Sequence, residues 1–347
     1  MVRHREVRRR RAGRQGQQEE LEVKKERVLV TGGGGYVGSV VTLRLLKAGY
    51  AVTVIDNLTH SGDGVLAFYG DADYEFVRAD VRDYEKVRGT LKKVNAVIHL
   101  AAIVGDPASK KFPKDTVEIN KEASIKLIDM AQEARVGRFI FFSTCSNYGI
   151  ADFQKLSDED TPLKPISLYA ETKVAVEKYL LAQERPGFSP LVLRVSTVFG
   201  CSPRMRFDLT INQFVMEAIR DKKLVIFSPK AWRPYIHIRD VADAVLACIQ
   251  AEESKVHREV YNLGRNDMSF TKMEIATLVQ KMIPGTEVEV QGAGTDLRDY
   301  RVNFSKWTKS FPGIPSRNIE QGLAELKSVL NDWKIIINPE QEKYRNA

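Results

Sequence analysis

Tyr169 and Lys173 stand four residues apart in the stretch LYAETK (168–173). On a helix, residues with this spacing share a face, so the lysine ammonium would lie beside the phenol. A nearby positive charge stabilises a phenolate, and a phenol tuned in this way can exchange a proton with a hydroxyl group near neutral pH. The same spacing also occurs on ordinary surface helices. It therefore indicates proton-transfer chemistry only together with other groups.

Short hydroxyl side chains supply a second candidate group. In the stretch FFSTCSNYG (141–149), Ser143, Thr144 and Ser146 lie at or just after the carboxyl end of an expected strand. Open α/β sheets bind ligands at the carboxyl ends of their strands, so a hydroxyl there could hold the substrate oxygen that Tyr169 addresses. A serine-rich turn is the structural alternative. Cys145 is most simply interpreted as a small buried residue.

A glycine-rich turn stands near the start of the chain. In RVLVTGGGGYVGS (27–39), an apolar strand leads into Gly32, Gly35 and Gly38 and then into a helix. Glycine permits positive φ and lets a phosphate reach backbone N–H groups, and the helix dipole attracts a pyrophosphate. Asp56 ends the next expected strand, where a carboxylate can accept both ribose hydroxyls of an adenosine and would repel a 2′-phosphate. The unit therefore predicts NAD as the cofactor.

Later strand ends add candidates for the same cofactor. Asp80, in RADVRD, could accept a hydrogen bond from an adenine amino group. The small residues of HLAA (99–102) leave room for a flat ligand. The cofactor-binding candidates from these stretches are Gly32, Gly35, Tyr36, Val37, Gly38, Asp56, Asn57, Asp80, Val81, Leu100, Ala101, Ala102, Ser143, Tyr169 and Lys173.

These residues need a scaffold, and apolar strands alternate with helical patterns through the first half of the chain. Buried strands of this kind are typical of a parallel sheet covered on both faces. We therefore predict a Rossmann-type doubly wound α/β domain over 26–200 and a smaller α/β substrate-binding lobe over 201–338, some segments of which can return to the first domain. The expected strands lie at 27–31, 51–55, 75–78, 96–100, 139–143 and 191–196, and the expected helices at 36–48, 83–92, 116–135, 169–185, 209–220, 239–251, 271–282 and 319–330.

The net charge of +8 over 347 residues is mostly a property of the N-terminus. Residues 1–18 hold seven arginines and one glutamate, which leaves the remainder nearly neutral. We predict a disordered basic tail over 1–25 and favour a solvated extension over a contact for nucleic acid or another anion, which stays open as the alternative.

The apolar runs and the cysteines indicate the cellular compartment of the protein. No apolar run is long enough for a membrane span, and the three cysteines indicate a reducing compartment, so a cytoplasmic enzyme is expected. No His/Cys cluster has metal-ligand spacing, and no metal is predicted.

The chain resembles the nucleotide-sugar epimerase/dehydratase family of extended short-chain dehydrogenases/reductases. The motifs TGGGGYVG, DN (56–57), HLAA, STCSNYG, YAETK, LRVSTVFG, RPYIHIRD and YNLG follow the order of that family from about residue 27 to 330. The resemblance implies that Tyr169 is the general base and acid, that Lys173 tunes it and positions NAD, and that Thr144 hydrogen-bonds the reacting oxygen. It also implies a homodimer.

Further site residues follow from the same resemblance. Asn120 matches an asparagine near the cofactor, and Arg233 matches an arginine that grips the substrate diphosphate, a task that suits a bidentate guanidinium. The expected substrate-binding residues are Thr144, Ser146, Thr197, Arg204, Arg206, Arg233 and Arg301.

The resemblance favours a nucleotide-sugar 4-epimerase that works through a transient 4-keto sugar. Family dehydratases carry an Asp-Glu pair directly after the catalytic Thr, where this chain has Cys145 and Ser146, so 4,6-dehydration is disfavoured. Thr197 replaces an asparagine of many 4-epimerases, and Asn147 replaces a usual valine. A 4-keto-sugar reductase or dehydrogenase, and a non-catalytic NAD-binding protein with an RNA- or anion-binding tail, stay open as alternatives.

Overall fold

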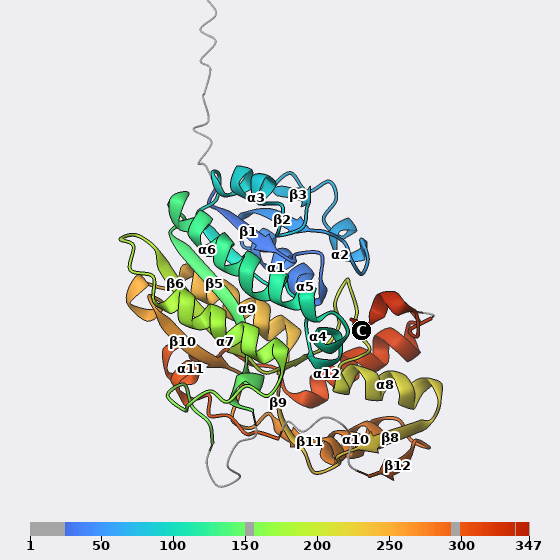
Figure 1. The fold of residues 1–347 in the computed structure, drawn as a ribbon. Helices are drawn as coiled ribbons and strands as arrows, with labels where there is room; N and C mark the ends of the chain where they lie inside the picture. The colour runs from blue at the N-terminus through green and yellow to red at the C-terminus, as the bar shows by residue number, and fades with distance from the viewer. Residues whose placement is uncertain (1–24, 150–155, 293–298, 337, 347) are drawn as a thin grey trace, which may run out of the picture.

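A seven-stranded parallel sheet forms the centre of the molecule (Figure 1). The computed structural model describes residues 25–149, 156–292, 299–336 and 338–346. The strand order places β1 between β2 and β4, so the chain reverses its direction of winding there, as in the predicted doubly wound fold. From edge to edge the strands are β10 (Glu259–Leu263), β6 (Ser189–Val195), β5 (Arg138–Thr144), β4 (Ala96–His99), β1 (Arg27–Thr31), β2 (Ala51–Asp56) and β3 (Tyr74–Arg78).

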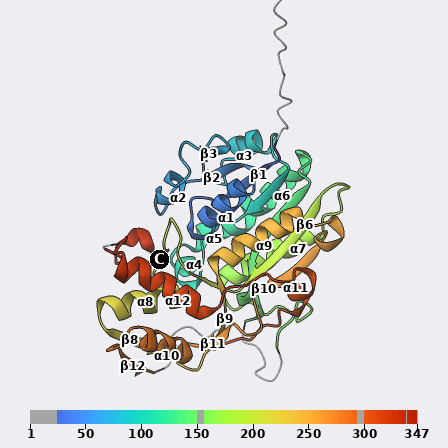
Figure 2. The same ribbon diagram turned by 180° about the vertical axis from the view of Figure 1, so that it is seen from behind.

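Helices cover both faces of this sheet (Figures 1 and 2). Val28 and Val30 of β1 pack with α1 (Tyr36–Lys47) and α9 (Ile238–Gln250). Leu29, which points to the opposite face, packs with α3 (Tyr84–Leu91), α6 (Ser124–Glu133) and α7 (Leu168–Leu181). Alternate residues of a strand point to opposite faces, so burial on both sides explains the unbroken apolar strands.

The second half of the chain builds a smaller lobe with its own core, to which Phe214, Ile275 and Leu323 belong. Two elements from this half of the sequence belong to the large domain. β10 is an edge strand of the large sheet, and α9 packs in the helix layer on one face of that sheet. The lobe contains β7 (Thr197–Phe199), β9 (Trp232–His237) and β11 (Ser269–Thr271) in one sheet, β8 (Lys223–Phe227) and β12 (Glu287–Gln291) in another, and helices α8 (Thr210–Arg220), α10 (Lys272–Met282) and α12 (Ile319–Lys327).

Short elements complete the structure. They are α2 (Asp63–Leu66), α4 (Asp106–Lys111), α5 (Pro113–Val117), η1 (Glu118–Ala123), η2 (Cys145–Tyr148), η3 (Glu253–Lys255), α11 (Ser305–Ser310), η4 (Ser328–Asp332) and η5 (Glu342–Tyr344). No helix in the described ranges is long and apolar enough to cross a membrane. The basic tail predicted over 1–25 lies outside the described residues except for Lys25.

The helix expected at 116–135 differs from a regular α-helix. The helical segment begins at Pro113, ends at Glu133 and contains the π turn η1 between α5 and α6. Within this turn the side-chain amide of Asn120 accepts from the N–H of Ile103 and donates to its carbonyl, both at 2.8 Å. The π turn η1 thus includes the residue that contacts the loop after β4. The helical periodicity of the sequence does not reveal this contact.

Helix α2 packs directly on the glycine turn. A Cβ at Gly64 would lie 2.2 Å from the carbonyl oxygen of Gly34, whereas a Cβ at Gly62 would meet no heavy atom within 4 Å. We expect Gly64→Ala to lower the free energy of unfolding by roughly 1–3 kcal/mol, because the backbone must shift. The matched change Gly62→Ala should stay within about 0.5 kcal/mol of the native protein. Urea denaturation of both variants tests this, and equal stabilities would contradict the close packing.

Candidate active site

The glycine turn forms a cradle without side chains between β1 and α1. Gly32 has a φ of +73°, and a Cβ there would lie 2.8 Å from the backbone nitrogen of Ala101. A Cβ at Gly38 would lie 2.1 Å from the carbonyl oxygen of Gly32. Gly35 is the N-cap residue of α1, and no side chain hydrogen-bonds to that helix end. The cradle therefore offers the free helix N-terminus and close backbone approach that a dinucleotide pyrophosphate needs.

Asp56 fastens this turn to the end of β2. Its carboxylate oxygens accept from the N–H of Gly34 at 3.0 Å and from the N–H of Leu58 at 2.8 Å. Burial raises the pKa of Asp56, and the two backbone donors oppose that rise. Each carboxylate oxygen keeps a further lone pair, so the group can still accept from ribose hydroxyls.

Asp80 has several partners already. It accepts from the amide of Asn57 at 2.9 Å and pairs with Arg82 at 2.9 Å. Burial alone would raise the pKa of Asp80, but the hydrogen bonds from Arg82 and Asn57 outweigh it and lower that pKa. Val81 beside it is buried. The carboxylate lies at the strand end where the sequence predicted it, as one member of a polar cluster.

Residues 100–103 follow β4 and form the opposite wall of the cradle. The closeness of Ala101 to Gly32 places Leu100, Ala101 and Ala102 against the glycine turn. Asn120 holds the far end of this stretch through Ile103. The structure therefore brings the predicted small residues and Asn120 to one side of the cofactor cradle.

Tyr36 connects the cradle to the smaller lobe. Its hydroxyl donates to the carbonyl of Gly200 at 2.7 Å and accepts from the amide of Asn212 at 3.0 Å. The hydroxyls of Ser39 and Ser202 meet at 3.0 Å beside it. Val37, the next residue of α1, packs against the core of the large domain. Tyr36 thus joins the two halves at the start of α1.

Lys173 lies between β5 and Tyr169. Its Nζ donates to the carbonyl of Phe142 at 2.9 Å and lies 5.9 Å from the centre of the Tyr169 ring. Both side chains are more than nine-tenths buried. Burial lowers the pKa of Lys173 to about 8, and the nearby charge of Glu177 opposes this. The lysine and the phenol therefore share one buried face of α7, as the sequence spacing predicted.

Thr144 and Ser146 form a pair of hydroxyls at the end of β5. The hydroxyl of Thr144 donates to that of Ser146 at 3.0 Å and accepts from the N–H of Ser146 at 3.1 Å. Cys145 points the other way, with its Sγ 3.1 Å from the carbonyl oxygen of Arg194. It is fully buried, and burial raises the pKa of its thiol to about 12. Cys145 is thus an interior residue, as interpreted from the sequence.

Ser143 belongs to a buried network behind this turn. Its hydroxyl donates to the carboxylate of Glu177 and accepts from the amide of Asn147 at 3.0 Å. Glu177 in turn pairs with Arg194 at 2.9 Å. The structure therefore places Ser143 among residues that hold the turn.

The predicted arginines lie in different surroundings. Arg233 is 4% exposed and its guanidinium carbon lies 5.3 Å from the ring centre of Tyr300. Arg301 is exposed and lies over Trp232. Arg233 is connected to the hydroxyl pair through Tyr300.

Three other predicted substrate-binding residues have partners elsewhere in the smaller lobe. Arg206 pairs with Asp208 through two bonds of 3.0 and 2.6 Å, and the buried Arg204 donates to the carbonyl of Arg345 at 3.0 Å. Thr197 lies in β7, opposite Tyr235 of β9.

Tyr300 is a candidate site residue that the sequence did not reveal. It is 3% exposed, and its hydroxyl lies 3.5 Å from that of Ser146. The stretch RDYRVNF drew attention to Arg301, whereas the structure turns the neighbouring tyrosine inward. The two hydroxyls are separated by 154 residues, so no local pattern could have revealed the contact.

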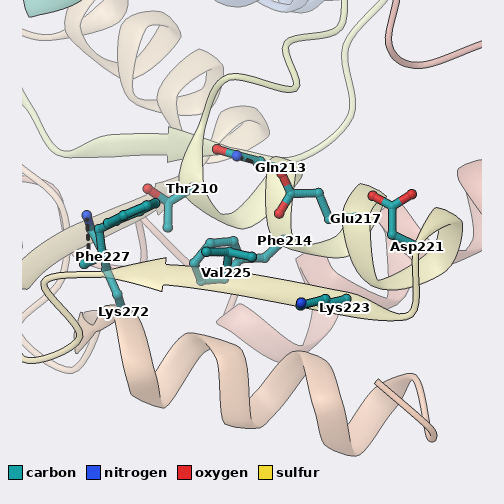
Figure 3. Close-up of a pocket in the computed structure, with 9 residues that line it drawn as sticks. All are labelled: Thr210, Gln213, Phe214, Glu217, Asp221, Lys223, Val225, Phe227 and Lys272. Atoms are coloured by element: carbon teal, nitrogen blue, oxygen red, sulfur yellow. Dashed lines mark hydrogen bonds between the residues drawn. The ribbon is translucent and has the colours of Figure 1, made fainter. Parts of the chain in front are cut away.

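A groove of about 550 Å³ runs between α8 and β8 (Figure 3). Lys272 lies at one end of the groove, and the preceding Thr271 pairs with Trp232 of β9, the residue before Arg233. Lys272 donates to the carbonyl of Phe227 at 3.2 Å, and Gln213 donates to Glu217 at 2.8 Å. The lining residues are Thr210, Gln213, Phe214, Glu217, Asp221, Lys223, Val225, Phe227 and Lys272.

The fold and the cradle define a dinucleotide-binding Rossmann enzyme, and comparison with known proteins gives the family. The model of the NAD dependent epimerase/dehydratase family matches residues 28–264. The chain belongs to this family, and its cofactor is NAD, which the cradle and Asp56 fit. Within the described ranges, no group of three or more His, Cys, Asp or Glu side chains could hold a metal ion.

Relatives within the family carry different activities. The UDP-glucuronate 4-epimerase of Thermodesulfobacterium geofontis is 28% identical over 85% of this chain and 93% of its own length. UDP-glucuronic acid decarboxylase 1 of Arabidopsis thaliana is 27% identical over 88% of this chain and 70% of its own. The solved UDP-glucose 4-epimerase of Thermotoga maritima with UDP-glucose has a TM-score of 0.77 at 26% identity, covering 86% of this chain and 97% of that one.

Removing the carboxylate of Asp56 tests its role toward the ribose. We expect Asp56→Ala to raise the Kd for NAD roughly 10- to 100-fold, since hydrogen bonds to charged groups contribute about 1.5–3 kcal/mol. Asp71→Ala is a matched control, because the exposed Asp71 likewise accepts from the N–H two residues ahead, at 2.9 Å. Titration calorimetry with NAD gives both values. An Asp56→Ala protein with native affinity would contradict the assignment.

The buried ammonium of Lys173 should make the free energy of unfolding depend on pH. The folded protein holds this proton up to a pH of about 8, whereas an unfolded chain holds it to 10.5. The cost of the buried charge is therefore complete below about pH 8 and disappears as the pH rises toward 10.5.

The variant Lys173→Met keeps most of the volume and removes the charge. We expect it to be more stable than the native protein near neutral pH by up to about 3 kcal/mol, less the hydrogen bond to Phe142. This difference should shrink in alkaline buffer. Urea denaturation of NAD-free protein at both pH values measures it, and a difference independent of pH would count against a buried, titrating lysine.

Proposed function

We propose that the protein is an NAD-dependent nucleotide-sugar 4-epimerase that works through a transient 4-keto sugar. The observation that carries this proposal is the contact between α7 and β5: Lys173, 5.9 Å from the centre of the Tyr169 ring, donates to the carbonyl of Phe142, shortly before Thr144. Tyr169, Lys173 and Thr144 are 8%, 3% and 9% exposed. A buried phenol can move one proton to and from a sugar oxygen when an ammonium lies beside it and a hydroxyl at a strand end hydrogen-bonds the same oxygen.

Each residue has a defined task in this proposal. NAD, when bound, supplies the oxidation of C4 and its reversal. Tyr169 takes the proton of the sugar O4 and later returns it. Thr144 donates a hydrogen bond to O4, and Lys173 keeps positive charge beside the phenolate.

The nucleotide half of the substrate has its own candidate contacts. Arg233 offers a buried guanidinium for the diphosphate. The groove between α8 and β8 offers an apolar floor of Phe214 and Val225 with polar groups along its rim, which suits a nucleobase (Figure 3). Lys272 at one end of the groove follows Thr271, whose strand partner is the residue before Arg233, so we place the diphosphate and the base in adjoining positions.

The turn after Thr144 supports epimerisation over elimination of water. Elimination across C5 and C6 needs an acid and a base next to the sugar. Here Cys145 faces the interior and Ser146 carries only a hydroxyl. The similarity to a UDP-glucuronate 4-epimerase agrees with this choice.

Decarboxylation of a nucleotide-linked uronic acid is a second candidate. A 4-keto uronic acid is a β-keto acid, so it can lose carbon dioxide without a further acid or base. The same three residues would then suffice, and the relatives include a UDP-glucuronic acid decarboxylase. Incubation of the holoenzyme with 4-hydroxyl hexoses and uronic acids linked to UDP, GDP and dTDP distinguishes the outcomes, because NMR shows either an isomer or a pentose product.

Tyr169→Phe removes the proton acceptor and keeps the ring. We expect turnover to fall roughly 10²- to 10⁴-fold, the usual contribution of a general acid–base group, while NAD stays bound. Tyr179→Phe on the same helix is the control, since its hydroxyl contacts Asp129 at 2.5 Å. NMR of the nucleotide-sugar products measures both rates. Turnover near the native rate in Tyr169→Phe would exclude the mechanism.

A further inference from the structure

Tyr300 is wedged between the catalytic turn and Arg233. Together with Val302 and Phe304 it packs against Cys145 and Tyr148 of η2. The stretch is anchored at both ends, because Asp299 accepts from the N–H of Trp232 at 3.0 Å and residues 301–303 bond to Ser157 on both sides. The position of the Tyr300 hydroxyl is therefore fixed by packing.

Three hydroxyls form a row at this point. The Thr144 hydroxyl donates to that of Ser146 at 3.0 Å, and the Ser146 hydroxyl lies 3.5 Å from that of Tyr300, where either can donate. A hydroxyl has one hydrogen and two lone pairs. The row can therefore point its hydrogens in either direction without any movement of the backbone.

We propose that Tyr300 is a positioning residue that lets this row reverse when the substrate binds. The inference rests on the proposed function, in which O4 gives its proton to Tyr169 and accepts a hydrogen bond from Thr144. Thr144 must then turn its hydrogen away from Ser146 and toward O4. Ser146 donates to Thr144 in its place, and Tyr300 donates to Ser146.

The reversal involves only rotation of O–H bonds. No covalent bond forms or breaks in the row, and the one proton transferred still passes from O4 to Tyr169. A chain of hydrogen bonds that all point one way strengthens its last donor, here the Thr144 hydroxyl on the developing carbonyl oxygen.

Arg233 supports the outer end of the row. Its guanidinium lies over the Tyr300 ring, and a cation at this position draws electron density from a phenol and makes its O–H a better donor. Because phenylalanine keeps the ring, Tyr300→Phe removes the hydroxyl and leaves the stacking partner of Arg233 in place.

The expected effect falls on the oxidation step. Tyr300→Phe should slow oxidation of the sugar by the holoenzyme roughly 3- to 10-fold. Ser146→Ala should slow it at least as much, and Ser146→Thr, which keeps a hydroxyl, should restore most of the rate. Tyr179→Phe should react at the native rate.

Two measurements provide the test. The first is single-turnover formation of NADH, followed by its absorbance, with the panel of nucleotide sugars. Both candidate reactions begin with this oxidation, so the readout does not depend on the final product. The second is calorimetric binding of a nucleotide sugar and of its 4-deoxy analogue. Tyr300→Phe should weaken binding of the 4-hydroxyl sugar and leave binding of the analogue unchanged.

The outcomes separate the two proposals. If Thr144→Ala oxidises the sugar at the native rate, the proposed function fails. If Thr144→Ala is slow while Tyr300→Phe and Ser146→Ala react and bind like the native protein, only the hydroxyl row is overturned. Equal weakening of both ligands in Tyr300→Phe also overturns it, because that result assigns Tyr300 to packing of the binding site.

Discussion

The buried ion pair between Arg194 of β6 and Glu177 of α7 is the interaction on which the candidate active site depends. The side chains are 6% and 2% exposed and lie 2.9 Å apart. Removing either partner would leave an uncompensated charge in the interior, which costs several kcal/mol. The pair is tolerable because neighbours satisfy it: Arg194 donates to the Tyr148 hydroxyl, and Glu177 accepts from Asn147 and Ser143. One polar network thereby ties β6, α7 and the turn after β5 together.

That network connects the elements that carry the proposed catalytic residues. Tyr169, Lys173 and Glu177 follow each other at four-residue intervals, so they lie along one face of α7. Thr144 comes directly after Ser143, whose hydroxyl bonds to Glu177. A buried carboxylate thus connects the helix that carries Tyr169 to the strand end that carries Thr144. The departure of Asn147 from the family pattern also gains a structural explanation, because its amide donates to that carboxylate at 2.8 Å.

The sequence predicted those features that depend on neighbouring residues. The expected strands and the glycine turn lie within about two residues of their observed positions, because apolar runs and glycines act locally. The π turn at Asn120, the return of β10 to the large sheet and the contact between Tyr300 and Ser146 depend on residues far apart in the chain. The pairing of Arg206 with Asp208 is local and could have been foreseen from their spacing.

In the proposed reaction, the residues of the turn after Thr144 limit what can happen to a 4-keto sugar. The thiol of Cys145 faces the interior, and the Ser146 hydroxyl belongs to a hydrogen-bonded row, so in the proposed reaction this turn directs a hydrogen bond to one oxygen only. In the proposed reaction the nucleotide is held at a distance from that oxygen, by Arg233 and by the groove along α8 and β8. A ligand anchored through its nucleotide keeps rotational freedom at its sugar. Such an arrangement suits a reaction in which the ketone presents first one face and then the other to the same cofactor.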